Sequence, residues 1–81
     1  MLTPAQSQQL QRDVDRRLGR AQASLSALAG KTLTSEDAAL VTQIRTFISQ
    51  AREARQTDPL RASNLAERAE VLARDLVRRL R

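Results

Sequence analysis

The stretch that decides the fold is residues 40–76, LVTQIRTFISQAREARQTDPLRASNLAERAEVLARDL. Apolar residues recur in it at steps of three and four, once before and once after Asp58-Pro59. These steps place the apolar side chains on one side of an α-helix. Asp58 suits a helix N-cap, Pro59 suits the first helical position, and a residue before proline is pushed out of helical geometry. We therefore expect two helices joined by a short break at 56–58.

A third apolar run lies before this stretch and has its own start and stop signals. Thr3-Pro4-Ala5-Gln6 combines a capping threonine, a proline at the first helical position and a glutamine that reaches back to the cap. Gly30 can adopt the left-handed conformation that ends a helix at low cost, so we expect the first helix to end near Ala29. We call the apolar stripe that each helix is expected to turn toward the core its seam. The expected seams, in the order of the three helices, are Leu10, Val14, Leu18, Ala21, Leu25 and Leu28; Leu40, Ile44, Phe47, Ala51 and Ala54; and Ala62, Leu65, Ala69, Leu72, Leu76 and Leu80.

These signals predict an all-α fold, an antiparallel up-down-up three-helix bundle with helices at about 4–29, 35–55 and 59–80. Both connections are short, which favours antiparallel neighbours. With 81 residues, we expect one domain that spans the chain, 1–81. Val41 and Ile48 widen the apolar face of the second helix, so this helix is predicted to make most contact with both others.

The residue content argues against an enzyme. The chain has no Cys and no His, which removes thiolate nucleophiles, imidazole bases and the usual zinc ligands. Its two glycines stand apart, so there is no phosphate-binding loop. A carboxylate pair would need two acids facing one pocket, and no acid falls on an apolar seam. We predict no catalytic residue, no cofactor and no metal site.

Most acids have a structural role in this interpretation. Asp58 is a cap, and Glu36 and Asp37 lie in a first turn, where the helix dipole favours negative charge. The remaining expected ion pairs are Asp13 with Arg16 and Arg17, Glu70 with Arg74, and Asp75 with Arg78 and Arg79.

The net charge is +5, and Lys31 is the only lysine among the 14 basic residues. Arginine without lysine, beside abundant Ala and Leu, is typical of a GC-rich genome, whereas an excess of cations also suits an anionic partner. The candidate anion-binding residues are Arg12, Arg16, Arg20, Arg74, Arg78 and Arg79. They could neutralise phosphates of a nucleic acid without reading its sequence. Pairing with neighbouring acids and with the helix dipole is the alternative role for the same residues.

Membrane and targeting signals are weak. The uncharged stretch Ala21–Gly30 is about half of what a membrane span needs, so we predict no transmembrane segment. Met1-Leu2-Thr3-Pro4 lacks the basic and apolar regions of a signal peptide. The default localisation is cytoplasmic, with the cell envelope as the alternative if the domain comes from a longer exported protein.

Binding to another protein remains as the expected class of function. Val71 is the clearest candidate for an exposed apolar side chain, since it points away from the seam of the third helix. Seams rich in alanine also leave room for self-association through apolar area that a second copy would cover.

The stretch 42–76, TQIRTFISQAREARQTDPLRASNLAERAEVLARDL, resembles a tetratricopeptide-type helical hairpin. Asp58-Pro59 stands at the turn, and Ala62, Ala66 and Ala69 have the small-residue spacing of its second helix. The stretch is also similar to Ala- and Arg-rich helical domains of uncharacterised bacterial envelope lipoproteins. Both resemblances imply binding rather than catalysis. The sequence thus predicts a non-enzymatic bacterial protein-interaction or scaffolding domain with an unidentified protein partner; the alternative is a basic helical protein that binds nucleic acid or another anionic surface.

Overall fold

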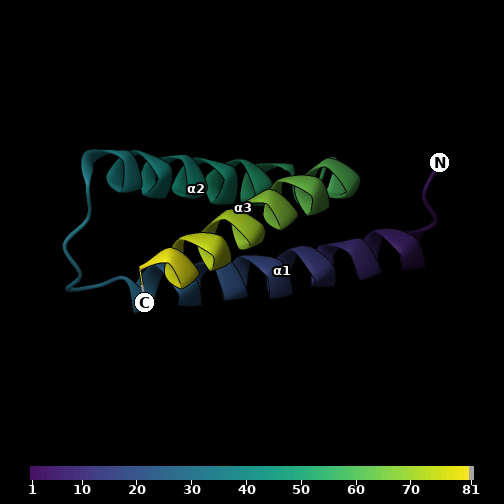
Figure 1. The fold of residues 1–81 in the computed structure, drawn as a ribbon. Helices are drawn as coiled ribbons and strands as arrows, with labels where there is room; N and C mark the ends of the chain where they lie inside the picture. Colours follow the sequence, from purple (N-terminus) through teal and green to yellow (C-terminus); the bar gives the residue numbers. More distant parts are fainter. Residues whose placement is uncertain (81) are drawn as a thin grey trace.

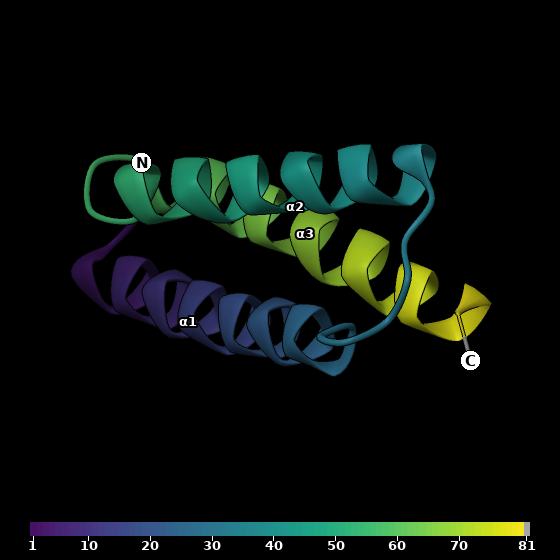
Figure 2. The ribbon, with the colours of Figure 1, turned by 90° about the vertical axis from the view of Figure 1, so that its left-hand side faces the viewer.

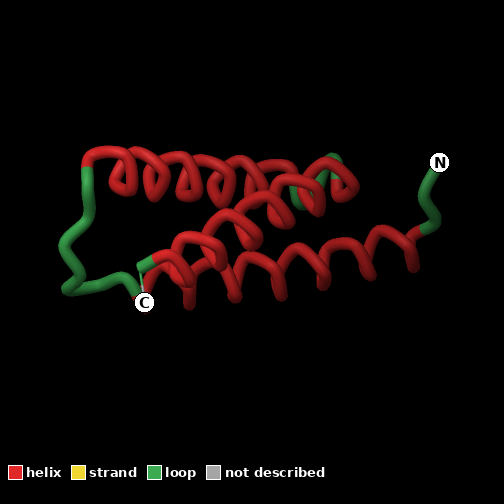
Figure 3. The backbone as a smooth tube through the Cα atoms, in the orientation of Figure 1, coloured by secondary structure: helices red, strands yellow, loops and turns green. Residues whose placement is uncertain are grey.

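The computed structural model describes residues 1–80. Three helices, α1 (Pro4–Ala27), α2 (Ser35–Ala54) and α3 (Pro59–Arg79), follow one another up, down and up (Figure 1). Two connections join them, and no strand is present in the described part of the chain (Figure 3). The predicted all-α three-helix bundle is confirmed.

The helix starts are set by the residues that the sequence marked. The Thr3 hydroxyl accepts from the Gln6 backbone N–H at 3.1 Å, and the Gln6 side chain accepts from the Thr3 N–H at 2.9 Å. Asp58 accepts from the Arg61 N–H at 3.2 Å. Gly30 has a φ of +82°, as expected for the residue that ends a helix. α1 nevertheless ends before residue 29, because the chain already tightens into a turn at Leu28, whose N–H donates to the Leu25 carbonyl three residues back.

The helix in contact with both others is α3, not α2, so that prediction was wrong. α3 runs diagonally from the end of α2 to the end of α1 and packs along both (Figure 1). α1 and α2 make little contact with each other. The physical reason lies in alanine: Ala66 and Ala73, which no predicted seam included, are fully buried on α3. Small side chains let two neighbours approach one helix closely, and they widen its apolar face beyond the leucine seam.

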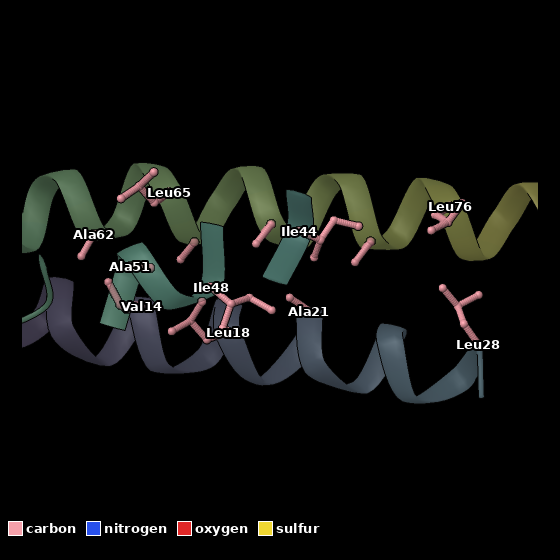
Figure 4. Close-up of a cluster of buried hydrophobic side chains, with 13 residues drawn as sticks. Val14, Leu18, Ala21, Leu28, Ile44, Ile48, Ala51, Ala62, Leu65 and Leu76 are labelled. Carbon is pink, nitrogen blue, oxygen red and sulfur yellow. The ribbon is translucent and has the colours of Figure 1, made fainter. Parts of the chain in front are cut away.

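The core is one cluster built from all three helices (Figure 4). Ile44, Leu76 and Val14 are its largest fully buried side chains. On α2 the buried face is turned slightly from the predicted seam, since Ile48 is buried and Phe47 is only half-buried. The buried residues of this cluster are Val14, Leu18, Ala21, Leu28, Ile44, Ile48, Ala51, Ala62, Leu65, Ala66, Ala69, Ala73 and Leu76.

The molecule is slender, with extents of 45 × 17 × 15 Å. None of the helices in residues 1–80 is both long enough and apolar enough to cross a membrane.

Candidate functional site

Polar side chains join α1 to the end of α2 at one end of the bundle. Arg55, which follows α2, donates from Nε and Nη2 to the two carboxylate oxygens of Asp15 on α1, each at 2.8 Å. The Gln11 side chain donates to the Arg55 carbonyl at 3.3 Å. The hydrogen bond to Asp15 outweighs desolvation and raises the pKa of Arg55. These contacts fasten the first half of α1 to the end of α2.

Beyond this fastening, α1 and α2 diverge and leave a groove of about 420 Å³. Figure 2 shows the two helices with α3 behind them. At the far end the groove reaches Leu33 in the connection between α1 and α2. Its lining residues are Gln22, Leu25, Ser26, Leu28, Ala29, Leu33, Val41, Arg45, Ile48, Ser49 and Arg52.

The groove has an apolar floor. Leu28 and Ile48 belong to the core and are buried, while Leu25, Leu33 and Val41 are only half-buried. These half-buried side chains come from both helices and from their connection. Apolar area therefore remains open to a further element between α1 and α2.

The two walls of the groove differ in charge. On α2, Arg45, Ser49 and Arg52 stand on one face at steps of four and three residues. Both arginines are exposed, and neither forms an ion pair within residues 1–80. The opposite wall consists of Gln22 and Ser26 on α1 and Ala29 just after it, and it carries no charge. The site is thus an apolar trough with one cationic edge.

The predicted anion-binding residues lie elsewhere, and none of them lines the groove. On α1, Arg16 pairs with Asp13 at 3.0 Å and Arg20 pairs with Glu70 at 3.2 Å. Arg12 forms no ion pair within the described residues.

The predicted anion-binding residues of α3 are also largely paired with acids. Arg74 lies 3.5 Å from its neighbour Asp75, and Arg79 reaches Asp37 on α2 at 3.4 Å. Arg78 forms no ion pair within residues 1–80. The expected pairing of Asp75 with Arg78 and Arg79 was wrong, because Asp75 lies beside Arg74 and the Arg79 side chain reaches Asp37 on α2 instead.

A polar cluster connects α1 with α3. Asp13 accepts from Arg17 at 2.9 Å and from the Ser63 hydroxyl at 2.9 Å, and Arg17 also donates to Glu70 at 3.1 Å. The predicted pairs of Asp13 with Arg16 and Arg17 are confirmed. Glu70 pairs across the interface and not with its helical neighbour Arg74, since the approach of α1 brings two arginines to its carboxylate.

The cluster shifts the pKa values of its members. Burial alone would raise the pKa of Asp13, but the hydrogen bonds from Arg17, Ser63 and Arg16 together lower it below its ordinary value of 3.8. The hydrogen bond to Asp13 raises the pKa of Arg17 against the opposing effect of burial. The cluster therefore holds its charges in place and contributes to the α1–α3 interface.

No catalytic or metal arrangement is visible within residues 1–80. No group of three or more acidic, His or Cys residues there is placed to hold a metal ion. The buried polar side-chain atoms of this part of the chain all have hydrogen-bond partners. Its acids are engaged by arginines, by helix starts or by solvent.

Two hollows that are more open to solvent, of about 560 and 460 Å³, lie away from the groove. One, between α2 and α3, is lined by Phe47, Val71 and Leu72 among polar residues. The other, beside the start of α1, includes Leu2, Leu10 and Leu60. Val71 is half-buried, so its prediction as the clearest exposed apolar residue was wrong. Within residues 1–80 the large exposed apolar side chains are Met1, Leu2 and Leu60.

The groove was not predicted, although the sequence contained a signal for it. Val41 and Ile48 widen the apolar face of α2. This width predicted contact with two helices, but only α3 packs closely against α2. Both residues of the widened face line the groove instead, with Ile48 buried in its floor and Val41 only half-buried. Arg45 and Arg52 become candidate binding residues only because they line this groove, since their spacing alone is ordinary for the exposed face of a helix.

No family model matches the chain, and no curated protein or solved structure matches it either. What the protein does must therefore be inferred from its own residues and their geometry.

Proposed function

We propose that the chain is a protein-interaction domain that binds a helix of a partner protein in the groove between α1 and α2. The observation that carries this proposal is the incomplete cover of α2. Its apolar face is wide enough for two neighbours, yet only α3 packs along it, and Val41 remains half-buried in the groove. Amphipathic helices bind such grooves through apolar side chains at steps of three and four residues.

The length of the groove suits a short helix. On α2 its lining runs from Val41 to Arg52. Eleven helical steps of 1.5 Å span about 16 Å, or three turns. A helix laid there would turn the three-helix bundle into a four-helix arrangement in which α3 and the partner cover opposite sides of α1 and α2.

A display library of helical peptides tests this proposal. Clones are selected on the intact protein and then compared on two variants, Ser49→Trp and Gln50→Trp. Ser49 stands on the groove wall, so tryptophan there fills the groove, whereas the adjacent Gln50 is exposed and lines none of the three hollows described above. Both changes add the same bulk to the same helix, which makes Gln50→Trp the matched control.

We expect peptides that bind the unmodified protein and Gln50→Trp but lose binding to Ser49→Trp. Two results would overturn the proposal: the absence of any helical binder, or a set of binders that Ser49→Trp leaves unaffected. Circular dichroism of both variants confirms that the helices are retained.

The alternative function, binding to nucleic acid or another anionic surface, has weaker support. Arg16, Arg20, Arg74 and Arg79 already have acidic partners, although exposed ion pairs are weak and phosphates can compete for them. Arg12 and Arg78 are the candidates without an acidic partner in residues 1–80. Fluorescence anisotropy with labelled duplex and single strand tests this alternative. Micromolar binding that weakens steeply with salt would favour it over groove binding.

A further inference from the structure

We infer that the helix bound in the groove is acidic along one flank, with Asp or Glu side chains seven residues apart that face Arg45 and Arg52. This inference rests on the proposed function and specifies the chemistry of the partner. It comes from the charge of the groove wall, which is independent of the apolar floor.

The two arginines are free to bind a partner. Both are exposed and have no ion pair in residues 1–80, whereas Arg55, just after the same helix, is held by Asp15. Arg52 lies in the last turn of α2, where its charge also suits the helix dipole, but Arg45 lies in the middle of the helix and has no such role. No contact within residues 1–80 therefore gives the charge of Arg45 a structural role.

Their spacing sets the spacing of the partner's acids. Seven helical residues rise about 10.5 Å and complete nearly two turns, so Arg45 and Arg52 project from the same side of α2. A helix that lies along α2 brings two acids seven residues apart opposite these arginines. Ser49, between the arginines on this wall, leaves room for a small polar side chain between the acids.

The uncharged α1 wall fixes which flank is acidic. Gln22, Ser26 and Ala29 offer no cation, so acids on that side of the partner would gain no ion pair. The partner's three faces are thus assigned: apolar residues toward Leu25 and Val41, acids toward α2, and small or polar uncharged residues toward α1. Complementary charge of this kind contributes mainly to specificity and association rate.

A second copy of this chain does not have the required pattern. No two acids in the sequence are seven residues apart. Two copies, each with a net charge of +5, also repel one another. The charges therefore favour a different protein as the occupant.

The test uses peptides that bind in the groove, defined by their loss on Ser49→Trp. Their affinities are measured for the charge-reversed double variant Arg45→Glu/Arg52→Glu and for Arg12→Glu/Arg61→Glu. Arg12 and Arg61 are exposed, have no ion pair in residues 1–80 and lie outside the groove. Both double variants change the net charge equally, so the second controls for long-range attraction. Thermal melts check that both stay folded.

We expect the selected groove peptides to carry Asp or Glu at seven-residue spacing on one flank. Charge reversal at the groove should weaken their binding by about tenfold or more, while the control pair should change it less than about threefold. A new selection on Arg45→Glu/Arg52→Glu should enrich Lys or Arg at the same peptide positions.

Groove peptides without acidic enrichment, or equal losses in the two double variants, would overturn the inference and leave the proposed function standing. A concentration-dependent dimer that Ser49→Trp dissociates, in place of any peptide binding, would assign the groove to a second copy and also overturn it. The failure of every groove binder would overturn the proposed function itself.

Discussion

Gly19 lies in the middle of α1, and nothing stands within 4 Å of the position where a Cβ would be. The glycine therefore does not serve a close approach of another helix. We predict that Gly19→Ala stabilises the protein by about 1 kcal/mol, because alanine has the higher helix propensity. The thermal midpoint should rise by roughly 4–8 °C for a domain of this size.

Gly30→Ala is the opposing control for this prediction. Its positive φ of 82° disfavours any residue with a Cβ, so the same change there should lower the midpoint although space is available. A lower midpoint for Gly19→Ala would show that α1 needs flexibility or an unseen contact at that position.

Asp13 predicts an acid-dependent contribution to stability. Its pKa in the folded state lies below the ordinary value of 3.8, so the unfolded chain binds more protons as the pH falls past that value. The contribution is complete above about pH 4 and is lost as the pH falls through the lower folded-state pKa. Thermal melts between about pH 2 and pH 7 should show a steeper fall below pH 4 for the unmodified protein than for Asp13→Asn. Equal slopes would contradict this assignment.

At the scale of the element, the helix starts were predictable and the packing was not. Thr3, Thr34 and Asp58 act on backbone N–H groups within three residues, so local sequence contains all of the information. The face of α3 depends on where α1 and α2 lie. Ala66 and Ala73 contribute little apolar area, so the sequence pattern alone did not mark them as part of the buried face of α3.

The alanines of α3 predict a size limit at its interfaces. Ala69 is fully buried, so Ala69→Leu forces side chains or whole helices apart and should cost about 1–3 kcal/mol. Denaturant unfolding measures this cost. Ala23→Leu is the control, since Ala23 is exposed on α1 and the change there should stay within about 0.5 kcal/mol. An equally small loss of stability for Ala69→Leu would mean that the interfaces of α3 have space for a larger side chain.

At the scale of the whole molecule, a small core must hold three helices together. Ile44 is fully buried, and Ile44→Ala should cost about 2–5 kcal/mol, a large share of the stability of a small domain. Leu72 was expected to be equally buried, but it lies at the edge of the core, so Leu72→Ala should cost less. Chemical denaturation of both variants checks the order. A larger loss of stability for Leu72→Ala than for Ile44→Ala would show that the buried faces of α2 and α3 are not the ones described.

The groove also belongs to the whole molecule, which explains why the sequence did not predict it. Its lining comes from α1, from α2 and from the connection between them, and α1 and α2 make little contact with each other while α3 packs against both. Arg55 and Asp15 fasten α1 to the end of α2 through a contact across 40 residues of sequence. Short-range patterns contain no information about such a distant pairing. They did show that α2 has more apolar surface than one neighbour covers.

The most direct test of the central claim is an NMR titration of methyl-labelled protein with a helical peptide selected on it. The account predicts shifts and intermolecular contacts at the methyl groups of Leu25, Leu33 and Val41, with Leu10 and Leu72 unchanged. Contacts confined to Val71 and Leu72, between α2 and α3, would contradict the assignment of the groove as the binding site.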